Sequence, residues 1–343
     1  MTMRVELTPV RDLPPRTIDA WHELAARAAE PNPWFEPQLI RPIAQHLVSD
    51  LMLLAAFRAE ELVACLPLMR TRMHWKRVGV PAWIVPHPCG TPLVDGLHAE
   101  DALRAMVDCL TRRGPEILLS WNGIAADGVA MAALDRTVAV SRRQMMNEGS
   151  WPFLRRRAEP TYLDAVLVGK RRRNLQRSRR LLQDRLDEPV RLVDHAGEPG
   201  VVDRFLALEA SGYKGRGGTA ILSDPHKPDY FRDVCAGFAA HGRLRILALE
   251  AGDTTLAMKC QMCAGDGVFE LKVGFDERYA TFSPGVLLEI DAVSWFHDGP
   301  YKWAVTNTLH AQSPLHWLWP DQQPFSSMDM RLGRAWRALK VLA

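Results

Sequence analysis

Apolar and polar residues alternate from Val268 to Phe275, which predicts a strand with one apolar and one polar face. A short polar segment then leads into an apolar run that begins at Ser283-Pro284-Gly285. Ser283 is a favoured helix N-cap, Pro284 fits the first helical position, and Gly285 lets a ligand approach the backbone. The free N–H groups of such a helix start favour a phosphate or carboxylate. The pattern therefore predicts an anion site, although an ordinary capped helix has the same signature.

The first half of the chain mixes helical and strand patterns. Helical spacing predicts helices at 16–29, 38–47 and 101–113, and β-rich runs predict strands at 5–7, 51–57, 62–69 and 116–120. Residues 80–92 are rich in proline, so we expect them to be irregular. Together these elements predict a mixed α/β domain.

The second half repeats this scheme. We expect strands at 161–163, 189–193, 244–249, 254–263 and 268–275, and helices at 168–186, 201–212, 229–241 and from Ser283 onward. Glycine, proline and three arginines gather without periodicity in residues 149–160. The sequence therefore predicts two α/β domains, residues 1–152 and residues 153–343, with the ligand site in the second.

The turn Ala264-Gly265-Asp266-Gly267 predicts a hairpin between two of these strands. An even loop places Gln261 opposite Glu270 and Lys259 opposite Lys272, all on the polar face. Two facing ammonium groups are unfavourable unless an anion lies beside them, and either Glu270 or a bound phosphate would serve. The alternative is a solvated face whose lysines extend into water.

A glycine-rich, cationic segment follows the predicted helix 201–212. Its glycines leave the backbone free to wrap a ligand, and Lys214 and Arg216 add positive charge. Glu209, one turn earlier, is a candidate general base, although an exposed glutamate on a helix is the commoner state. Gly212 is also explained as a helix C-cap.

Positive charge is unevenly placed along the chain and is concentrated in one predicted helix, although the formal net charge is only +3. The segment from Arg171 to Arg180 is rich in arginine, and an apolar stripe of Leu175, Leu181, Leu182 and Leu186 predicts that the helix is docked on the protein. Its outer side fits polyphosphate, RNA or acidic lipid, or is simply solvated.

The cysteines and the chain start limit the remaining classes of function. Cys260 and Cys263 form a C-x-x-C within a predicted strand and lack a second pair, so we expect neither a metal site nor a redox site. No apolar run has the length of a signal peptide or a membrane span. The working class is a cytoplasmic enzyme or binding protein.

These motifs, in this order, resemble a known family. Arg171-Arg172-Arg173-Asn174-Leu175, Lys214-Gly215-Arg216-Gly217-Gly218-Thr219 and Leu271-Lys272-Val273-Gly274-Phe275-Asp276-Glu277, followed by Ser283-Pro284-Gly285, are similar to the GNAT-like acyltransferases of the CelD/BcsL type. Pro31-Asn32-Pro33-Trp34-Phe35-Glu36-Pro37 fits the same group. That group is related to the FemABX peptidoglycan aminoacyltransferases and is built from two tandem GNAT-like domains.

The resemblance implies an N-acyltransferase that uses acyl-CoA or acetyl-CoA as co-substrate and needs no metal. The donor site would comprise Lys272, Ser283, Pro284, Gly285, Val286 and Leu287. An amine or hydroxyl of a saccharide-related or other cell-envelope acceptor would meet Tyr213, Lys214, Arg216, Lys259 and Gln261.

The resemblance also suggests candidate catalytic roles for four residues. Glu209 or Glu270 would take the acceptor's proton, Tyr279 would protonate the leaving thiolate, and Asp276 would orient the site or take part in the chemistry.

Two other functions follow from the same resemblance. FemABX relatives use aminoacyl-tRNA as donor, for which the Arg171–Arg180 helix would be the docking surface. A non-catalytic accessory protein of polysaccharide assembly would keep the fold without turnover. Peripheral membrane association is a further expectation from the basic helix.

Overall fold

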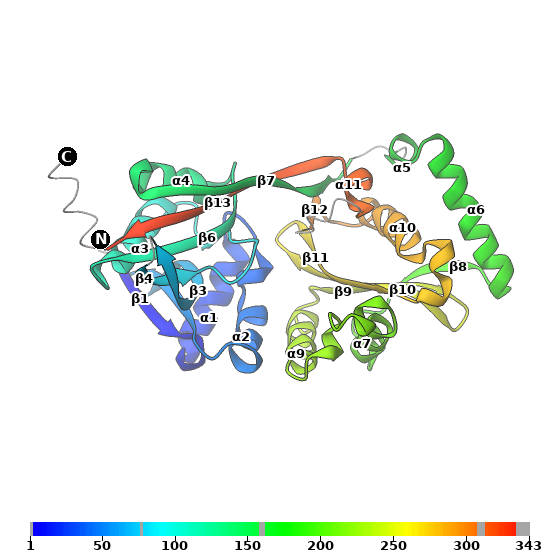
Figure 1. The fold of residues 1–343 in the computed structure, drawn as a ribbon, viewed down its shortest axis with the longest axis horizontal. Coiled ribbons are helices and arrows are strands. Elements are labelled where there is room, and N and C mark those ends of the chain that lie inside the picture. Colours follow the sequence, from blue (N-terminus) through cyan, green and yellow to red (C-terminus); the bar gives the residue numbers. More distant parts are fainter. Residues whose placement is uncertain (1–2, 76–77, 158–161, 307–312, 334–343) are drawn as a thin grey trace. The chain divides into compact units, whose positions relative to one another are not determined.

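The computed structural model describes residues 3–75, 78–157, 162–306 and 313–333. The chain divides into two compact units, one made of Met1–Ser150 with Gln323–Ala343 and the other of Trp151–Gln322 (Figure 1). The first break lies two residues before the expected one. The second differs from expectation, because the chain from Gln323 onward joins the first unit instead of completing the second.

The first unit is a mixed sheet with four α-helices in the described residues. The strand order is β1-β2-β3-β4-β6-β13, and β5 pairs with β3. The strands are β1 (Met3–Pro9), β2 (Leu51–Arg58), β3 (Glu61–Trp75), β4 (Val78–Ile84), β5 (Leu93–Val94), β6 (Ile117–Ala125) and β13 (Asp321–Leu332), and the helices are α1 (Pro15–Arg27), α2 (Pro37–His46), α3 (Ala99–Arg112) and α4 (Val129–Thr137).

Two segments of this half differ from the expected irregular structure. β4 is a strand in spite of Pro81, because it pairs antiparallel with β3 and parallel with β6. β7 (Arg143–Arg155) runs into the segment expected to separate the domains, because Phe153–Arg155 pair with β12 (Trp303–Val305). Pairing with distant strands outweighs the local proline and glycine signals in both places.

The second unit contains a sheet with the strand order β7-β12-β11-β10-β9-β8. Its elements, after β7, are α5 (Tyr162–Val166), α6 (Gly169–Leu186), β8 (Val190–Asp194), α7 (Val201–Ser211), α8 (Tyr213–Arg216), α9 (Lys227–Ala239), β9 (Leu244–Ala251), β10 (Thr254–Ala264), β11 (Gly267–Phe275), the 3-10 helix η5 (Glu277–Phe282), α10 (Pro284–Asp298), β12 and α11 (Leu315–Leu318). Figure 1 shows α7 and α9 on one face of this sheet and α10 on the other.

α10 is held on the sheet by an apolar side. Leu287, Leu288 and Ala292 pack with Leu247 and Leu249 of β9 in one core cluster. Burying each leucine contributes roughly 1.5–3 kcal/mol, which fixes the start of α10 beside β11. The mixed α/β class is confirmed. The prediction of a strand at 161–163 is wrong for its described residues, because Tyr162–Val166 is a short helix.

Candidate functional site

The second unit has a sheet edge that is left open beside β11. β10 pairs with β11 along its whole length, but β12 pairs only with Gly267, Val268 and Phe269. Within the described residues, no strand pairs with the stretch from Glu270 to Phe275 on that side. Such an edge presents backbone N–H and C=O groups that another chain or a ligand can bind.

A cavity of about 500 Å³ lies against this edge. Its walls come from β11, from the junction between η5 and α10, and from residues 313–315. The polar groups of the lining are those of Lys214, Glu270, Lys272, Ser283, Glu289, Thr306 and Ser313. A volume of this size fits a small-molecule ligand.

The hairpin register sets which side chains reach this cavity. Gln261 lies opposite Glu270, as predicted, but the pairing shifts between Cys260 and Gln261, so that Lys259 pairs with Val273 and Lys272 with Cys260. The predicted pairing of Lys259 with Lys272 is therefore wrong. A bulge adds one residue to a strand and reverses the faces of the residues beyond it. Lys272 is consequently turned away from the face that carries Lys259 and Glu270.

A fully buried ammonium group holds two carboxylates at the cavity wall. Lys259 Nζ lies 2.7 Å from Glu270 Oε1 and 2.6 Å from Glu289 Oε2. Gln261 donates to the same Glu270 oxygen at 2.7 Å. Lys259 is 0% exposed, and both glutamates line the cavity. Two acids and one base here leave one negative charge, which such a buried site accommodates by binding a proton.

The pKa values of this group agree with that charge balance. Burial raises the pKa of Glu289 from 4.5 to about 7, with Lys259 opposing the shift and Glu270 adding to it. Burial alone would lower the pKa of Lys259, but the two carboxylates outweigh it and raise that pKa. Lys259 is therefore charged, and Glu289 is the carboxylate that binds a proton near neutral pH.

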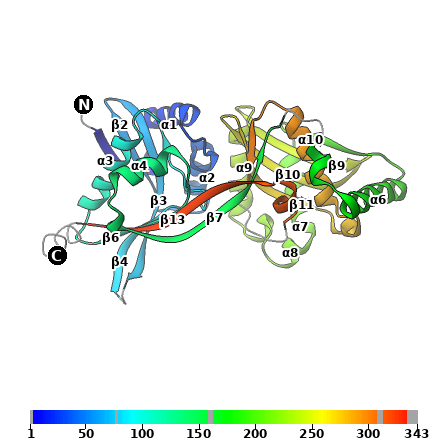
Figure 2. The same cartoon turned by 90° about the horizontal axis from the view of Figure 1, so that it is seen from above.

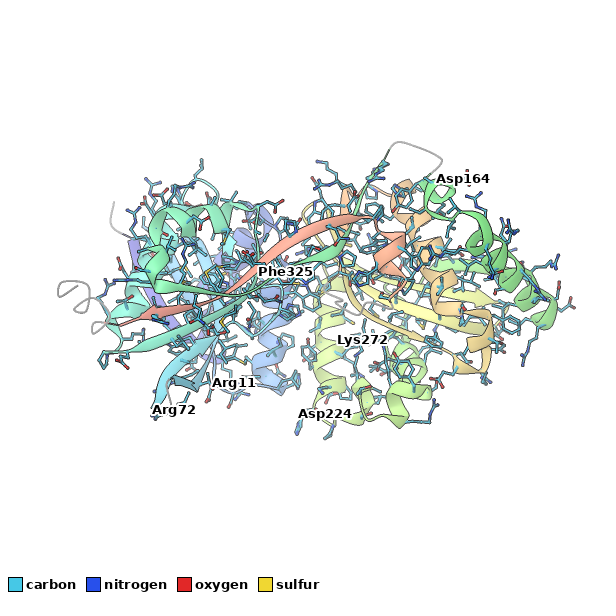
Figure 3. The ribbon with its side chains drawn as sticks, turned by 45° about the horizontal axis from the view of Figure 1, so that its top comes forward. Arg11, Arg72, Asp164, Asp224, Lys272 and Phe325 are labelled. Atoms are coloured by element: carbon cyan, nitrogen blue, oxygen red, sulfur yellow. The ribbon has the colours of Figure 1, made fainter. Side chains whose placement is uncertain are left out.

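A second cluster lies on the opposite side of β11. Glu209 Oε1 is 3.2 Å from Lys272 Nζ and 3.7 Å from Lys214 Nζ, and Glu209 Oε2 accepts the Ile221 N–H at 2.8 Å. Lys214 Nζ also donates to the Val273 carbonyl at 2.5 Å. Burial, followed by repulsion from Lys272, lowers the pKa of Lys214, whereas Glu209 opposes the shift. Lys272, labelled in Figure 3, and Lys214 both line the cavity, whereas Glu209 does not.

The start of α10 differs from the predicted cap. Ser283 precedes Pro284, as expected, but its backbone is left-handed, with φ 55°, and its side chain accepts no N–H. Val286 and Leu287 donate to the Ser283 carbonyl instead. Of the first-turn N–H groups, that of Gly285 has no hydrogen-bond partner among the described residues. The predicted set of free N–H groups is thus reduced to one, beside the cavity.

The other candidate residues occupy different surroundings. Leu287 is in the core, Asp276 is the N-cap of η5, and Tyr279 lies beneath Arg185 and Arg278. Tyr213 is 55% exposed, and Arg216 pairs with Glu277 at 2.6 Å. None of these five lines the cavity described above.

The glycine-rich segment after α7 is compact. A Cβ at Gly215 would lie 1.9 Å from the Ala210 carbonyl oxygen, so glycine is needed for α8 to pack on α7. This packing accounts for one glycine that the sequence alone associates with a wrapped ligand.

Glu289 was not predicted from the sequence. It is one of two acids, with Asp291, in the otherwise apolar stretch 286–293, one turn after Gly285, and a carboxylate within such an apolar helix is the signal that identifies it. Among the described residues, no group of three His, Cys, Asp or Glu is placed to hold a metal ion. In the same part of the chain, no helix has the length and apolar character to cross a membrane.

Comparisons with known proteins identify one domain family and a shared fold. The acetyltransferase (GNAT) domain family matches residues 169–303. No curated protein sequence is significantly similar to the chain. The crystal structure of FemX has a TM-score of 0.61 at 9% identity, and the similarity covers 99% of both chains.

Two other solved structures share the fold along nearly the whole chain. The C-terminal domain of a protein described as a lysylphosphatidylglycerol synthetase, from Agrobacterium fabrum, has a TM-score of 0.56 at 11% identity, covering 95% of this chain and 94% of that one. L-PGS from Bacillus licheniformis has a TM-score of 0.50 at 10% identity, covering 92% and 91%. At these identities the likeness concerns the fold.

The domain match and the shared fold confirm the expected GNAT domain in the second half of the chain and the expected α/β fold. The domain covers α6 to β12, and so includes β11, α10 and the paired glutamates. Residues 169–303 of the chain are thus a GNAT acetyltransferase domain, and the chain as a whole has the fold of FemX.

Proposed function

We propose that the protein transfers an acyl group from acyl-CoA to an amine or hydroxyl of a saccharide-related or other cell-envelope acceptor, in the cytoplasm, where this donor is found. The observation that carries this proposal is the open edge of β11 facing the start of α10 across one cavity. The amide groups of an acyl-pantetheine chain can pair with such an edge as an added strand would. The Gly285 N–H, Lys214 and Lys272 offer positive charge for donor phosphates.

Direct attack by an acceptor amine is the reaction that suits the paired glutamates. The amine loses a proton to the Glu270–Glu289 pair, and its nitrogen forms a bond to the thioester carbonyl carbon. The carbon–sulfur bond then breaks, and the thiolate takes a proton to leave as the thiol. Unpaired N–H groups of β11 would stabilise the negative charge that develops on the carbonyl oxygen. Tyr279 remains the candidate acid for the thiolate, since it adjoins the cavity residue Ala280.

The raised pKa of Glu289 makes this residue a suitable general base near neutral pH. A base works best when its pKa lies near the working pH, and the burial of Glu289 brings its pKa to about 7. Lys259 keeps both carboxylates in place without lining the cavity itself. We therefore propose Glu289, together with Glu270, as the proton acceptor. Lys259 and Gln261 would hold these two carboxylates in position.

An aminoacyl-tRNA donor is the second candidate, since the FemX fold extends over the whole chain. An accessory protein without turnover is the third. The three candidate functions predict different changes in thermal stability when a donor is added, so one experiment separates them.

Thermal unfolding in the presence of acetyl-CoA, a longer acyl-CoA or aminoacyl-tRNA tests the donor. A ligand at a hundredfold excess over its Kd stabilises the folded state by about 2.7 kcal/mol, which we expect for an acyl-CoA. Glu289→Gln and Glu270→Gln should retain this shift but lose amine acylation by about a hundredfold or more. Glu188→Gln, an exposed glutamate, is the matched control. If aminoacyl-tRNA alone stabilises the protein, aminoacyl-tRNA is the donor and not acyl-CoA. If no donor changes the unfolding temperature, the accessory protein without turnover is favoured.

A further inference from the structure

α6 carries eight cations and one acid, and four of the cations hold the helix on its own unit. Arg172 bonds the Leu167 carbonyl at 2.7 Å and Asp164 at 2.5 Å, and Arg179 bonds Asp291 of α10 at 2.5 Å. The other two lie over aromatic rings. These are Arg171 over Trp317 at 4.2 Å, and Arg185 over Tyr279 at 5.5 Å and Phe282 at 5.8 Å.

The other four cations form a row along the outside of the helix. Lys170, Arg173, Arg177 and Arg180 are exposed, and none of them has an ion pair or hydrogen bond with another described residue. At 100° per residue they fall within an arc of roughly 80°, opposite the buried Leu182. Figure 2 shows α6 at the end of the second unit, and Figure 3 shows nitrogen-tipped side chains along it. We call these four residues the cationic row.

Helix α6, on its inner side, contacts the segments that border the cavity. Arg171 is fastened to Trp317, which follows the cavity residues Pro314 and Leu315 closely in the chain. At the other end, Arg185 lies over Tyr279 and Phe282 of η5, whose Ala280 also lines the cavity. The inner side of the helix therefore contacts both segments that border the cavity, and the cationic row lies on its outer side.

We propose that the cationic row docks the protein on an anionic lipid surface. Four cations in one narrow arc can meet a plane at the same depth while the apolar side of α6 stays packed on the protein. Leu181 is 39% exposed next to the row and Val168 is 60% exposed at its start, and a lipid interface can bury both. α6 has no aromatic residue with which to stack bases, so RNA would gain only phosphate contacts. Asp184, in the same arc, is the one opposing charge.

Co-sedimentation of the full chain with vesicles tests this surface. The vesicles are phosphatidylcholine with and without phosphatidylglycerol. Each cation near an anionic surface raises binding about fivefold, so the variant R173Q/R177Q/R180Q should bind the anionic vesicles about a hundredfold more weakly. The control R16Q/R41Q/R113Q removes the same charge from exposed positions of the first unit and should bind like the unaltered chain. Binding should also fall steeply as salt is added.

Every outcome of this experiment bears on the surface. The proposal is supported if the unaltered chain binds only the anionic vesicles, and if the row variant loses this binding whereas the control variant keeps it. If both variants lose vesicle binding equally, binding depends on net charge alone and the proposal is overturned. The absence of any vesicle binding overturns it as well. A parallel titration with bulk tRNA addresses the other polyanion. Strong tRNA binding that the row variant loses, without vesicle binding, assigns the row to RNA. A cooperative thermal transition close to that of the unaltered chain, measured for each variant, shows that both variants are folded.

Discussion

At the scale of single residues, Glu289 sets a pH dependence of stability. Burial raises its pKa from 4.5 to about 7, so between those values the folded state binds more protons than the unfolded chain. The stability gained from this proton is full below pH 4.5 and is lost as pH rises through 7. Urea unfolding across this range should show a fall on the order of 3 kcal/mol that Glu289→Gln abolishes. An unchanged slope in that variant would assign the proton to another group.

Lys259 is the residue whose loss should cost most. Lys259→Met leaves two buried carboxylates without a counter-charge, and breaking a buried ion pair in this way costs about 3–5 kcal/mol. The double variant Lys259→Met, Glu289→Gln should recover part of that loss, because one uncompensated charge is removed. A double-mutant cycle by urea unfolding measures this coupling, and strictly additive losses would contradict it.

The sequence predicts individual contacts only as far as the local pattern remains regular. Gln261 faces Glu270 because a hairpin of known loop length fixes that pairing. Lys272 was assigned to the wrong face because a bulge adds a residue in a place that alternation does not reveal. Glu289 was missed because its partner Lys259 lies 30 positions away and meets it only when α10 packs on β10.

At the scale of elements, the start of α10 combines a helix terminus with the cavity wall. A Cβ at Gly285 would meet only Phe275, at 3.6 Å, and the rest of its surroundings are open. Gly285→Ala should therefore stabilise the helix by about 0.4–1 kcal/mol while its methyl group enters the donor space. We expect acyl-CoA to bind about tenfold more weakly by calorimetry. Gly96→Ala, with one neighbour at 3.4 Å, is the control, and equal donor affinity in all three proteins would remove Gly285 from the donor site.

Helices and central strands of the second unit follow from their periodicity, whereas short or interrupted elements do not. α6, α7 and β8 to β11 lie within a few residues of their predicted bounds, because long amphipathic patterns dominate them. β4 contains a proline and is a strand only because it has partners on both sides. Local signals report propensity, and tertiary pairing decides the outcome in such segments.

At the scale of the whole molecule, the chain returns to its first unit through β13. Gly123 donates its N–H to Ser327 Oγ, 204 positions along the chain, and Met330 pairs with Leu119. No periodic pattern in the sequence records a partner at such a distance. For this reason the sequence predicts a second domain that extends over residues 153–343, whereas the second unit of the structure ends at Gln322.

β13 should accordingly be required for the stability of the first unit. Phe325, Met328, Met330 and Leu332 are all buried, and at roughly 1.5–3 kcal/mol each their loss removes about 6–12 kcal/mol. Because a typical domain is stable by only 5–15 kcal/mol, a chain ending at Gln322 should unfold in its first unit. Limited proteolysis should then cleave residues 1–150 rapidly, whereas a chain ending at Gly333, which keeps every described strand, should resist. Met330→Ala in the full chain tests the same contact more mildly, with an expected cost of about 2–5 kcal/mol. Equal protease resistance of the two truncated chains would show that β13 is dispensable to the first unit.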